Sequence, residues 1–266
     1  MTADVDQLGT EMRVLWALDE RARIPVAHRA VLGVAADGYR LALGAGLPAG
    51  LAAAARRVVA EDPPGLPDRE RPSVLGPLAE LLAQDTGVEV TGHAGYRMPT
   101  DLTAPPPVGP AGRLVTAAGM VSTAGMVSTA GPADADPADA RTFTGPARPS
   151  TWTPAEWAAL LAGRGGVWAA VVVEGRVVSL CHTPAESAEG AEGGGWTDPD
   201  HRRRGYAAAV TAAWARAQPT GRTLFYSTSR DNVASQAVAA RLGLRPLGWM
   251  WKLSKPGRAG VHAGRR

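Results

Sequence analysis

The sequence predicts a mixed α/β protein that combines antiparallel strand pairs with amphipathic helices. Asp37-Gly38 separates two strand-like runs, which is typical of a β-hairpin. Glu174-Gly175 separates a second pair of runs in the same way. Residues 208–217 place apolar side chains at the 3.6-residue period of a helix packed on one face.

The first 103 residues are expected to form an N-terminal α/β unit of unknown role. Its predicted elements are a helix at 7–23, strands at 31–36 and 39–43, helices at 48–61 and 73–84, and a strand at 88–92. Pro48 suits the first turn of a helix, and Ser73 could cap the next. The glycines at 44–50 do not have the spacing of a dinucleotide loop, and the preceding hairpin argues against the βαβ unit that such a loop needs.

Residues 104–149 are expected to form a disordered linker. This segment contains three consecutive prolines at 105–107 and a tandem repeat, Ala-Gly-Met-Val-Ser-Thr, at 118–123 and 124–129. Two short copies are too few for a solenoid, and the segment is long for a packed loop. Residues 113–116 remain a candidate short strand. The basic, glycine-rich tail at 256–266 is expected to be flexible.

From residue 150 onward the predicted elements alternate regularly. Thr153, Pro154 and Glu156 have the pattern of a capped helix start. The elements expected after that helix are strands at 167–173, 176–182 and 192–197, a helix at 208–217, a strand at 222–229, a helix from Asn232 to Gly243, and a strand at 249–253.

The segment between Thr197 and Ala207 is a basic loop that opens a helix. A helix N-terminus presents unpaired backbone N–H groups and the positive end of the helix dipole. Gly205 lets a ligand approach the backbone closely, and the small side chain of Ala207 keeps that approach open. The loop is therefore predicted to bind an anion, of which pyrophosphate is a common example.

The spacing Arg202-x-x-Gly205-x-Ala207 resembles the acetyl-CoA loop of the GCN5-related N-acetyltransferase (GNAT) superfamily. A second run, from Ser229-Arg-Asp-Asn232 to Arg241-Leu-Gly243, is similar to the second cofactor motif of the same superfamily. The resemblance implies an acetyltransferase domain at 150–255, with acetyl-CoA as the acyl donor. It also implies a central mixed, mostly antiparallel, splayed sheet flanked by helices, preceded by the smaller N-terminal unit.

The loop and the resemblance together give a set of candidate cofactor-binding residues. The backbone amides of the loop are expected to do most of the binding, with the arginines adding charge at the rim. Plain packing is an equal alternative for Trp196, an N-cap role suffices for Asn232, and the arginine run could be only a solvated patch. The candidates are Trp196, Thr197, Arg202, Arg203, Arg204, Gly205, Tyr206, Ala207, Asn232 and Ser235.

Acetyl transfer to an amine needs a base that removes a proton from the nucleophile. Glu192 is the preferred candidate, because it lies on the strand that leads to the loop, as a Glu does in many members of the superfamily. Its orientation depends on the strand register, which a bulge could shift. Glu186, Glu189 and His182 are the alternatives.

The general acid is not identified. In many members of the superfamily a Tyr on the last helix donates a proton to the thiolate, but here Ala239 takes that place. Tyr226, on the preceding strand, does not obviously replace it. The resemblance implies an N-acetyltransferase in which a primary amine attacks the thioester directly. The missing Tyr favours the alternative, a non-catalytic acyl-CoA-binding or sensor module.

The composition limits the expected partners and location. The net charge is only +3, and Lys252 and Lys255 are the only lysines. The sequence thus lacks the dense basic face that is typical of nucleic-acid-binding proteins, and no nucleic-acid partner is expected. No apolar run approaches a membrane span, and the single Cys181 excludes an internal disulfide, which favours the cytoplasm. A small-molecule or peptide amine is the expected acceptor, and a homodimer is compatible with the sequence. Three tryptophans either line the acceptor site or belong to the core: Trp152, Trp157 and Trp168.

Overall fold

A computed structural model gives the fold of the chain. It describes residues 2–25, 28–62, 71–83, 87–100, 102, 108, 112–116, 120–122, 152–161 and 166–256. Most of the predicted linker, including the second copy of the repeat, lies outside the described residues, as does the tail from residue 257.

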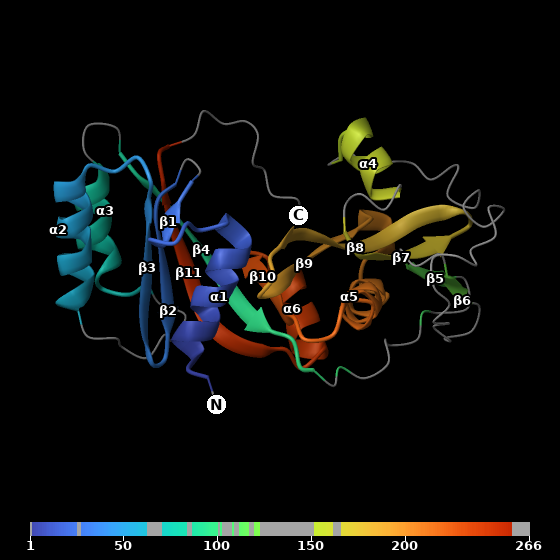
Figure 1. The fold of residues 1–266 in the computed structure, drawn as a ribbon. Coiled ribbons are helices and arrows are strands. Elements are labelled where there is room, and N and C mark those ends of the chain that lie inside the picture. The colour runs from blue at the N-terminus through green and yellow to red at the C-terminus, as the bar shows by residue number, and fades with distance from the viewer. Residues whose placement is uncertain are drawn as a thin grey trace.

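The described strands form one sheet. They are β1 Arg23–Ile24, β2 His28–Ala35, β3 Gly38–Gly44, β4 Glu89–Arg97, β5 Gly112–Thr116, β6 Met120–Ser122, β7 Trp168–Val173, β8 Arg176–Glu186, β9 Gly190–Thr197, β10 Thr223–Ser229 and β11 Arg245–Ser254. Their order is β1-β3-β2-β11-β4-β10-β9-β8-β7-β5-β6 (Figure 1). Only β1–β3 and β9–β10 pair in parallel among these strands. The predicted mixed, mostly antiparallel sheet is confirmed.

Helices cover both faces of the sheet. They are α1 Asp4–Trp16, α2 Ala49–Ala60, α3 Leu75–Ala83, α4 Pro154–Leu161, α5 Tyr206–Arg216 and α6 Val233–Arg241. On β11, Met250 packs with α1, whereas its neighbour Trp251 packs with α2 and α3. On β10, Phe225 packs with α1, whereas Tyr226 faces α5 and α6. Since neighbouring strand residues point to opposite faces, α1 lies opposite these other helices.

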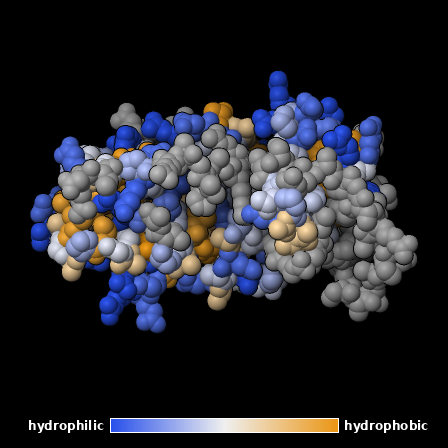
Figure 2. All heavy atoms as spheres, turned by 90° about the horizontal axis from the view of Figure 1, so that it is seen from above, coloured by the Kyte–Doolittle hydropathy of each residue, from blue (hydrophilic) through white to orange (hydrophobic). Residues whose placement is uncertain are grey.

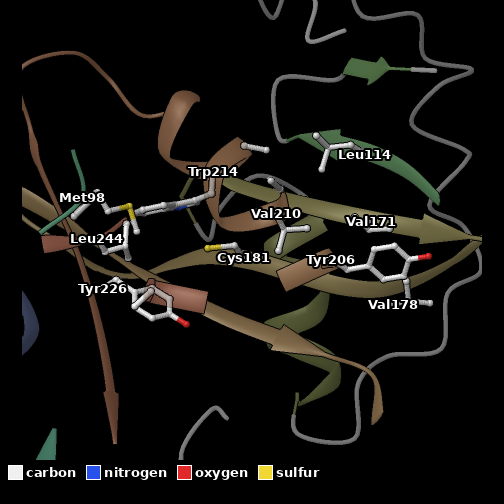
Figure 3. Packing of buried hydrophobic residues seen from close by; sticks show 14 of the residues in the cluster. Met98, Leu114, Val171, Val178, Cys181, Tyr206, Val210, Trp214, Tyr226 and Leu244 are labelled. Carbon is white, nitrogen blue, oxygen red and sulfur yellow. The ribbon is translucent and has the colours of Figure 1, made fainter. Parts of the chain in front are cut away.

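The core of the C-terminal half lies between α5 and strands β7 to β10. Val210 and Trp214 of α5 are fully buried there, next to Cys181 of β8 (Figure 3). Burial of a large apolar side chain contributes about 1.5–3 kcal/mol to stability. On the opposite face, Trp157 and Leu160 of α4 pack on β7 and β8. Seen from above, hydrophobic side chains also gather at the end formed by α2 and α3 (Figure 2).

Strands from the two halves of the sequence alternate in the middle of the sheet. β4, from the N-terminal segment, lies between β10 and β11, and pairs antiparallel with both. Arg97, for example, lies opposite Phe225 on one side and Arg245 on the other. β11 in turn pairs with β2 on its other edge. The N-terminal segment therefore completes the sheet of the C-terminal half.

Several local signals in the sequence are confirmed. The Asp37-Gly38 hairpin joins β2 and β3, with Ala35 opposite Gly38. Thr153 and Glu156 form the predicted capping box, in which Glu156 N–H donates to Thr153 Oγ1 and Thr153 N–H donates to Glu156 Oε2. The candidate strand at 113–116 forms as β5, which pairs with β7 and so extends the sheet into the predicted linker.

Other boundaries differ from the prediction. α1 begins three residues earlier than predicted because Asp37, from the hairpin, accepts the N–H groups of Asp4 and Val5. It ends at Trp16 rather than residue 23, because Ala17 takes a left-handed conformation with φ 46°. β4, β8 and β11 are each longer than predicted. Ser73 does not cap α3; its hydroxyl donates to Asp62.

None of the described helices combines the length and the apolar character that a membrane crossing would require.

Candidate functional site

The loop before α5 presents backbone N–H groups without backbone partners. Asp198 closes a short 3-10 helix at Pro199–His201 by accepting the N–H of Asp200. Arg203 and Gly205, with φ of 64° and 83°, then turn the chain into α5. The N–H of Ala209 makes the first bond of the helix, to the carbonyl of Gly205. Within the described residues, the N–H groups of 203–208 thus have no backbone acceptor, which suits an anion.

Arginine side chains surround this loop. Arg202, Arg203 and Arg204 are exposed. Arg241, in the last turn of α6, reaches over Gly205, so that a Cβ on Gly205 would lie 3.4 Å from Arg241 Nη2. Guanidinium groups and backbone N–H groups are both suited to phosphate oxygens. The donor set and the missing Cβ at Gly205 therefore fit the pyrophosphate of acetyl-CoA.

The other predicted cofactor residues of the two helices have roles in the fold. Tyr206 is buried against the sheet, so only its backbone faces the loop, and Ala207 is half-buried beside it. Asn232 caps α6 by accepting the N–H of Ser235 at 3.1 Å, which confirms the predicted N-cap. Ser235 Oγ lies 2.5 Å from the hydroxyl of Tyr226.

The strands β9 and β10 pair over only three residues and then separate. Their parallel ladder ends where Phe225 lies opposite Glu192. Beyond this point β9 continues to Thr197 beside β8, while β10 continues to Ser229 beside β4. Beyond Glu192, none of the described strands pairs with the edge of β9 that faces β10, next to the loop before α5. This is the splayed geometry that the resemblance to the GNAT superfamily implied.

Trp196 and Thr197 lie at the end of the separated part of β9. The Trp196 side chain packs against the apolar cluster under α4, which accounts for it by packing alone. Its carbonyl accepts a hydrogen bond from Ser179 Oγ at 3.2 Å. The Thr197 hydroxyl lies 2.8 Å from the same Ser179 oxygen. Side chains of both residues are therefore held by β8 and α4.

Glu192 occupies the point where the β9–β10 ladder ends. Its Oε1 accepts the backbone N–H of Ser227 at 2.6 Å and the Ser227 hydroxyl at 2.7 Å. Gly193, the next residue, faces Trp214 of α5, so Glu192 points to the opposite face, under α1. The side chain is only 3% exposed. Burial raises the pKa of Glu192 to about 7, and the two bonds from Ser227 oppose this rise.

A second buried carboxyl group, that of Glu11 on α1, interacts with Glu192. Glu11 is fully buried. Its carboxyl group lies against β4 where Gly95 leaves room, since a Cβ at Gly95 would collide with Glu11 Oε2. Burial raises the pKa of Glu11 well above its ordinary value, and the charge of Glu192 raises it further. Gly95 lies opposite Ser227, the residue that donates to Glu192, so both carboxyl groups lie at the same buried place in the sheet.

The alternative bases lie in other surroundings. Glu189 forms a surface ion pair with Arg13 of α1 at 2.7 Å. Glu186 forms one with Arg222 at 2.6 Å. His182 is buried with its ring edge-on to Trp152, at 4.8 Å between ring centroids. The register also places the bulge of this strand pair in β8, between His182 and Ala185, rather than in β9.

Tyr226 lies on the face of β10 opposite Ser227, next to α6. Ala239 of α6 is fully buried in the same cluster as Tyr226, four residues after Ser235. Burial raises the pKa of Tyr226 to about 12. Its hydroxyl therefore keeps its proton at neutral pH and shares a hydrogen bond with Ser235 Oγ, beside the helix position that Ala239 leaves without a polar group.

A cavity of about 370 Å³ lies between α4 and β8. Its lining includes Trp152, Glu156, Leu160, His182, Thr183 and Glu186. The cavity also contacts Ala185, which lies opposite Glu192 in the sheet. Of the three tryptophans considered for an acceptor site, Trp152 lines this cavity, and all three belong to the apolar cluster under α4.

Three residues of this region were missed by the sequence reasoning. Glu11 stands in an ordinary amphipathic helix, and no local pattern shows that it meets Glu192. Ser227 had no signal beyond its place on a strand. Arg241 was part of the second quoted motif, and its position at the end of a helix could have indicated a cation for the phosphate loop.

Part of the chain matches the model of a known protein family. Residues 116–245 match the family model of the acetyltransferase (GNAT) domain. No curated protein sequence matches the chain significantly.

Solved structures with a similar fold include three whose descriptions name the same family. A GCN5-related N-acetyltransferase from Kribbella flavida is 17% identical, with 97% of each chain covered and a TM-score of 0.44. A GNAT-family acetyltransferase from Novosphingobium aromaticivorans is 18% identical, with 64% of this chain and 67% of that chain covered and a TM-score of 0.40. A tandem GNAT protein from the clavulanic acid biosynthesis pathway is 16% identical, with 85% and 77% covered and a TM-score of 0.45. In two further structures this chain spans only 57% and 61% of the other protein's length.

Proposed function

Because residues 116–245 match the family model of the GNAT acetyltransferase domain, we propose that the protein is an acetyl-CoA-dependent N-acetyltransferase acting on a primary amine. The observation that carries the proposal is the anion-binding loop before α5. This loop lies beside the gap where β9 and β10 separate. It combines six consecutive N–H groups without a backbone acceptor, Gly205 in a left-handed conformation and the nearby guanidinium of Arg241.

The residues of the loop hold the phosphates, and the free edge of β9 orients the rest of the donor. The N–H groups of 203–208 and the side chain of Arg241 bind the pyrophosphate. The backbone of β9 between Gly193 and Thr197 supplies the hydrogen bonds that a strand partner would otherwise take. Bound acetyl-CoA supplies the thioester whose acetyl carbon the amine attacks directly.

Glu192 is the proposed base. Its carboxylate is buried, but Oε1 accepts the hydroxyl of Ser227, which is half-exposed. A proton from the acceptor ammonium reaches Glu192 through Ser227 Oγ, as the hydroxyl passes its own proton on and takes up the incoming one. A carboxyl group with a pKa of about 7 is well matched to proton transfer at neutral pH.

The absence of a Tyr at position 239 does not prevent the reaction in this proposal. An ordinary thiol has a pKa of about 8.5, so the thiolate is a stable leaving group that needs no strong acid. Tyr226 and Ser235 provide hydroxyl groups beside the same part of α6. The proposed binding site of the amine acceptor is the cavity between α4 and β8, because its lining includes Ala185, which lies opposite Glu192 in the sheet.

The location and partners are part of the proposal as well. A single, buried Cys181 suits a reducing compartment such as the cytoplasm. The acceptor is a small-molecule or peptide amine, with no role for nucleic acid.

A non-catalytic acyl-CoA-binding module is the second candidate, favoured by Ala239 and by the deep burial of Glu192. An amine library incubated with acetyl-CoA, with release of free CoA as the readout, separates the two. The acetyltransferase proposal expects CoA release that depends on at least one amine and disappears in Glu192→Gln. CoA binding without release for any amine class would favour the binding module.

A further inference from the structure

The buried carboxyl groups of Glu11 and Glu192 lack most of the hydrogen bonds that buried carboxyl oxygens normally make. Three of their four oxygens have no hydrogen-bond partner among the described residues: both of Glu11 and Oε2 of Glu192. Buried polar atoms normally have partners, and a buried charge without one is strongly disfavoured. A pair of neighbouring carboxylates cannot both ionise readily.

The position of Glu11 is fixed by several contacts of α1. One turn before it, Gln7 accepts a hydrogen bond from Arg97 of β4 at 3.0 Å. Two residues after it, Arg13 pairs with Glu189 at the start of β9. Gly95 of β4 provides the space for the carboxyl group itself. α1 is thus tied to the strands on both sides of the region in which the two carboxyl groups meet.

We propose that Glu11 and Glu192 share one proton, so that α1 of the N-terminal segment sets the protonation state of the base in the C-terminal half. The role of Glu192 as a base rests on the proposed function, whereas the shared proton is a property of the folded protein. Glu11 is here a positioning residue that acts through Glu192.

The surroundings decide where the charge and the proton reside. Ser227 donates two hydrogen bonds to Glu192 and none to Glu11, so the negative charge is stabilised on Glu192. The proton therefore resides on Glu11, where it is available to the free Oε2 of Glu192. This agrees with the pKa values, since that of Glu11 is raised further by the charge of Glu192.

Other titratable groups near the pair, on either face of the sheet, do not replace the shared proton. Cys181 of β8 is neutral at pH 7 because burial raises the pKa of its thiol. Tyr226 of β10 and His93 of β4 are also neutral, with pKa values of about 12 and about 4. Arg97 is charged, but it donates to Gln7 of α1. Lys252 lies farther along the sheet, on β11, beside Thr91.

The first test uses the apo protein and does not depend on catalysis. Carboxyl carbons of ¹³C-glutamate-labelled protein are titrated by NMR in the wild type, Glu192→Gln and Glu189→Gln. Interacting groups shift each other by more than about one pKa unit. The proposal expects the titration of Glu11 to move to lower pH by at least that amount in Glu192→Gln and to stay unchanged in Glu189→Gln, which removes another carboxylate that contacts α1. An unchanged titration of Glu11 in Glu192→Gln would overturn the shared proton.

The second test separates a positioning role from simple packing. Glu11→Gln keeps a neutral hydrogen-bond donor beside Glu192, whereas Glu11→Leu removes it. In the first variant the acid limb of the kcat/KM pH profile should stay near that of the wild type, and in the second it should move to higher pH by about one unit or more. Equal profiles in the two variants would overturn the role of Glu11. If no amine supports turnover, the proposed function fails, and the NMR titration still decides the shared proton.

Discussion

At the scale of single residues, Glu192 links the end of a strand ladder to the proposed chemistry. The carboxylate accepts the Ser227 N–H group at the place where the parallel ladder with β10 stops. The same burial that raises the pKa of Glu192 to about 7 keeps solvent away from it. Ser227 is the half-exposed group through which a proton can pass.

Replacement of Glu192 tests this role directly. Glu192→Gln keeps the size of the side chain but cannot take a proton at neutral pH, so we expect turnover to fall by roughly two to four orders of magnitude. CoA affinity should not change, and the loss should shrink as pH rises because more amine is already neutral. Glu189→Gln is the matched control, since that carboxylate forms a surface ion pair with Arg13. Normal turnover of Glu192→Gln at pH 7 would rule out Glu192 as the base.

The same buried carboxyl groups predict a pH dependence of stability. Because the folded-state pKa values of Glu11 and Glu192 are raised, folding retains protons that the unfolded chain releases above pH about 4.5. Their contribution to the free energy of unfolding is therefore full below that pH, and the part due to Glu192 falls as pH rises through about 7. His93 acts in the opposite direction between about 4 and 6.5, because its folded-state pKa is lowered.

The difference between variants isolates the carboxyl pair from His93. We expect the free energy of unfolding of Glu192→Gln to fall less steeply than that of the wild type between pH 5 and 8, with a slope difference of at most about 1.4 kcal/mol per pH unit per proton. Urea unfolding at several pH values measures it. Parallel curves for the two proteins would show that Glu192 is not buried as a raised-pKa group.

At the scale of elements, the N-termini of α5 and α6 differ in how their first N–H groups are satisfied. The Asn232 side chain caps α6 through the N–H of Ser235, and this explains the residue without any ligand. The helix α5 has a different start, because its N-cap is Gly205, which has no side chain to satisfy the first N–H groups. A ligand anion is therefore better accommodated at α5 than at α6.

Two substitutions at Asn232 distinguish capping from ligand contact. Asn232→Ala should lower the free energy of unfolding by about 0.5–2 kcal/mol through loss of the cap. Asn232→Asp keeps the cap and should restore that stability, while placing a negative charge next to the cofactor region. Weaker CoA binding by Asn232→Asp than by Asn232→Ala, measured by calorimetry, would support contact with the cofactor, and equal affinities would assign Asn232 to capping alone.

Local elements could be predicted from the sequence where their signals are local. The capping box at Thr153, the cap at Asn232 and the hairpin at Asp37-Gly38 each depend on neighbouring residues. The start of α1 could not be predicted, because Asp37 caps that helix from more than 30 residues away. The proximity of Glu11 to Glu192 likewise joins distant parts of the sequence, and no spacing rule predicts it.

At the scale of the whole molecule, the two halves of the sequence form one sheet. β11 lies between two strands of the N-terminal segment, and β4 lies between two strands of the C-terminal half. Separation of the halves would leave the paired edges of β2, β4, β10 and β11 without partners. It would also expose Met250 and Trp251, which are buried against helices of the N-terminal segment.

Fragments of the chain test this interdependence. Residues 1–103 and 104–266 produced separately should each aggregate or remain largely unfolded, because unpaired edge strands and apolar faces are exposed. Co-expression should restore a folded complex with the circular dichroism spectrum of the intact chain. A well-dispersed NMR spectrum from the C-terminal fragment alone would contradict the role of β4 in completing the sheet.

The central claim is that the loop before α5 binds the pyrophosphate of CoA, and thermal unfolding with CoA tests it most directly. At a hundredfold excess over the Kd, CoA should stabilise the native state by about 2.7 kcal/mol, which corresponds to a rise in Tm of roughly 5–10 °C. Gly205→Val should abolish this rise. Gly221→Val should retain it, because Gly221 has a similar left-handed φ of 89° but open space around it, and so controls for backbone strain. A wild-type melting curve that saturating CoA leaves unmoved would contradict the account.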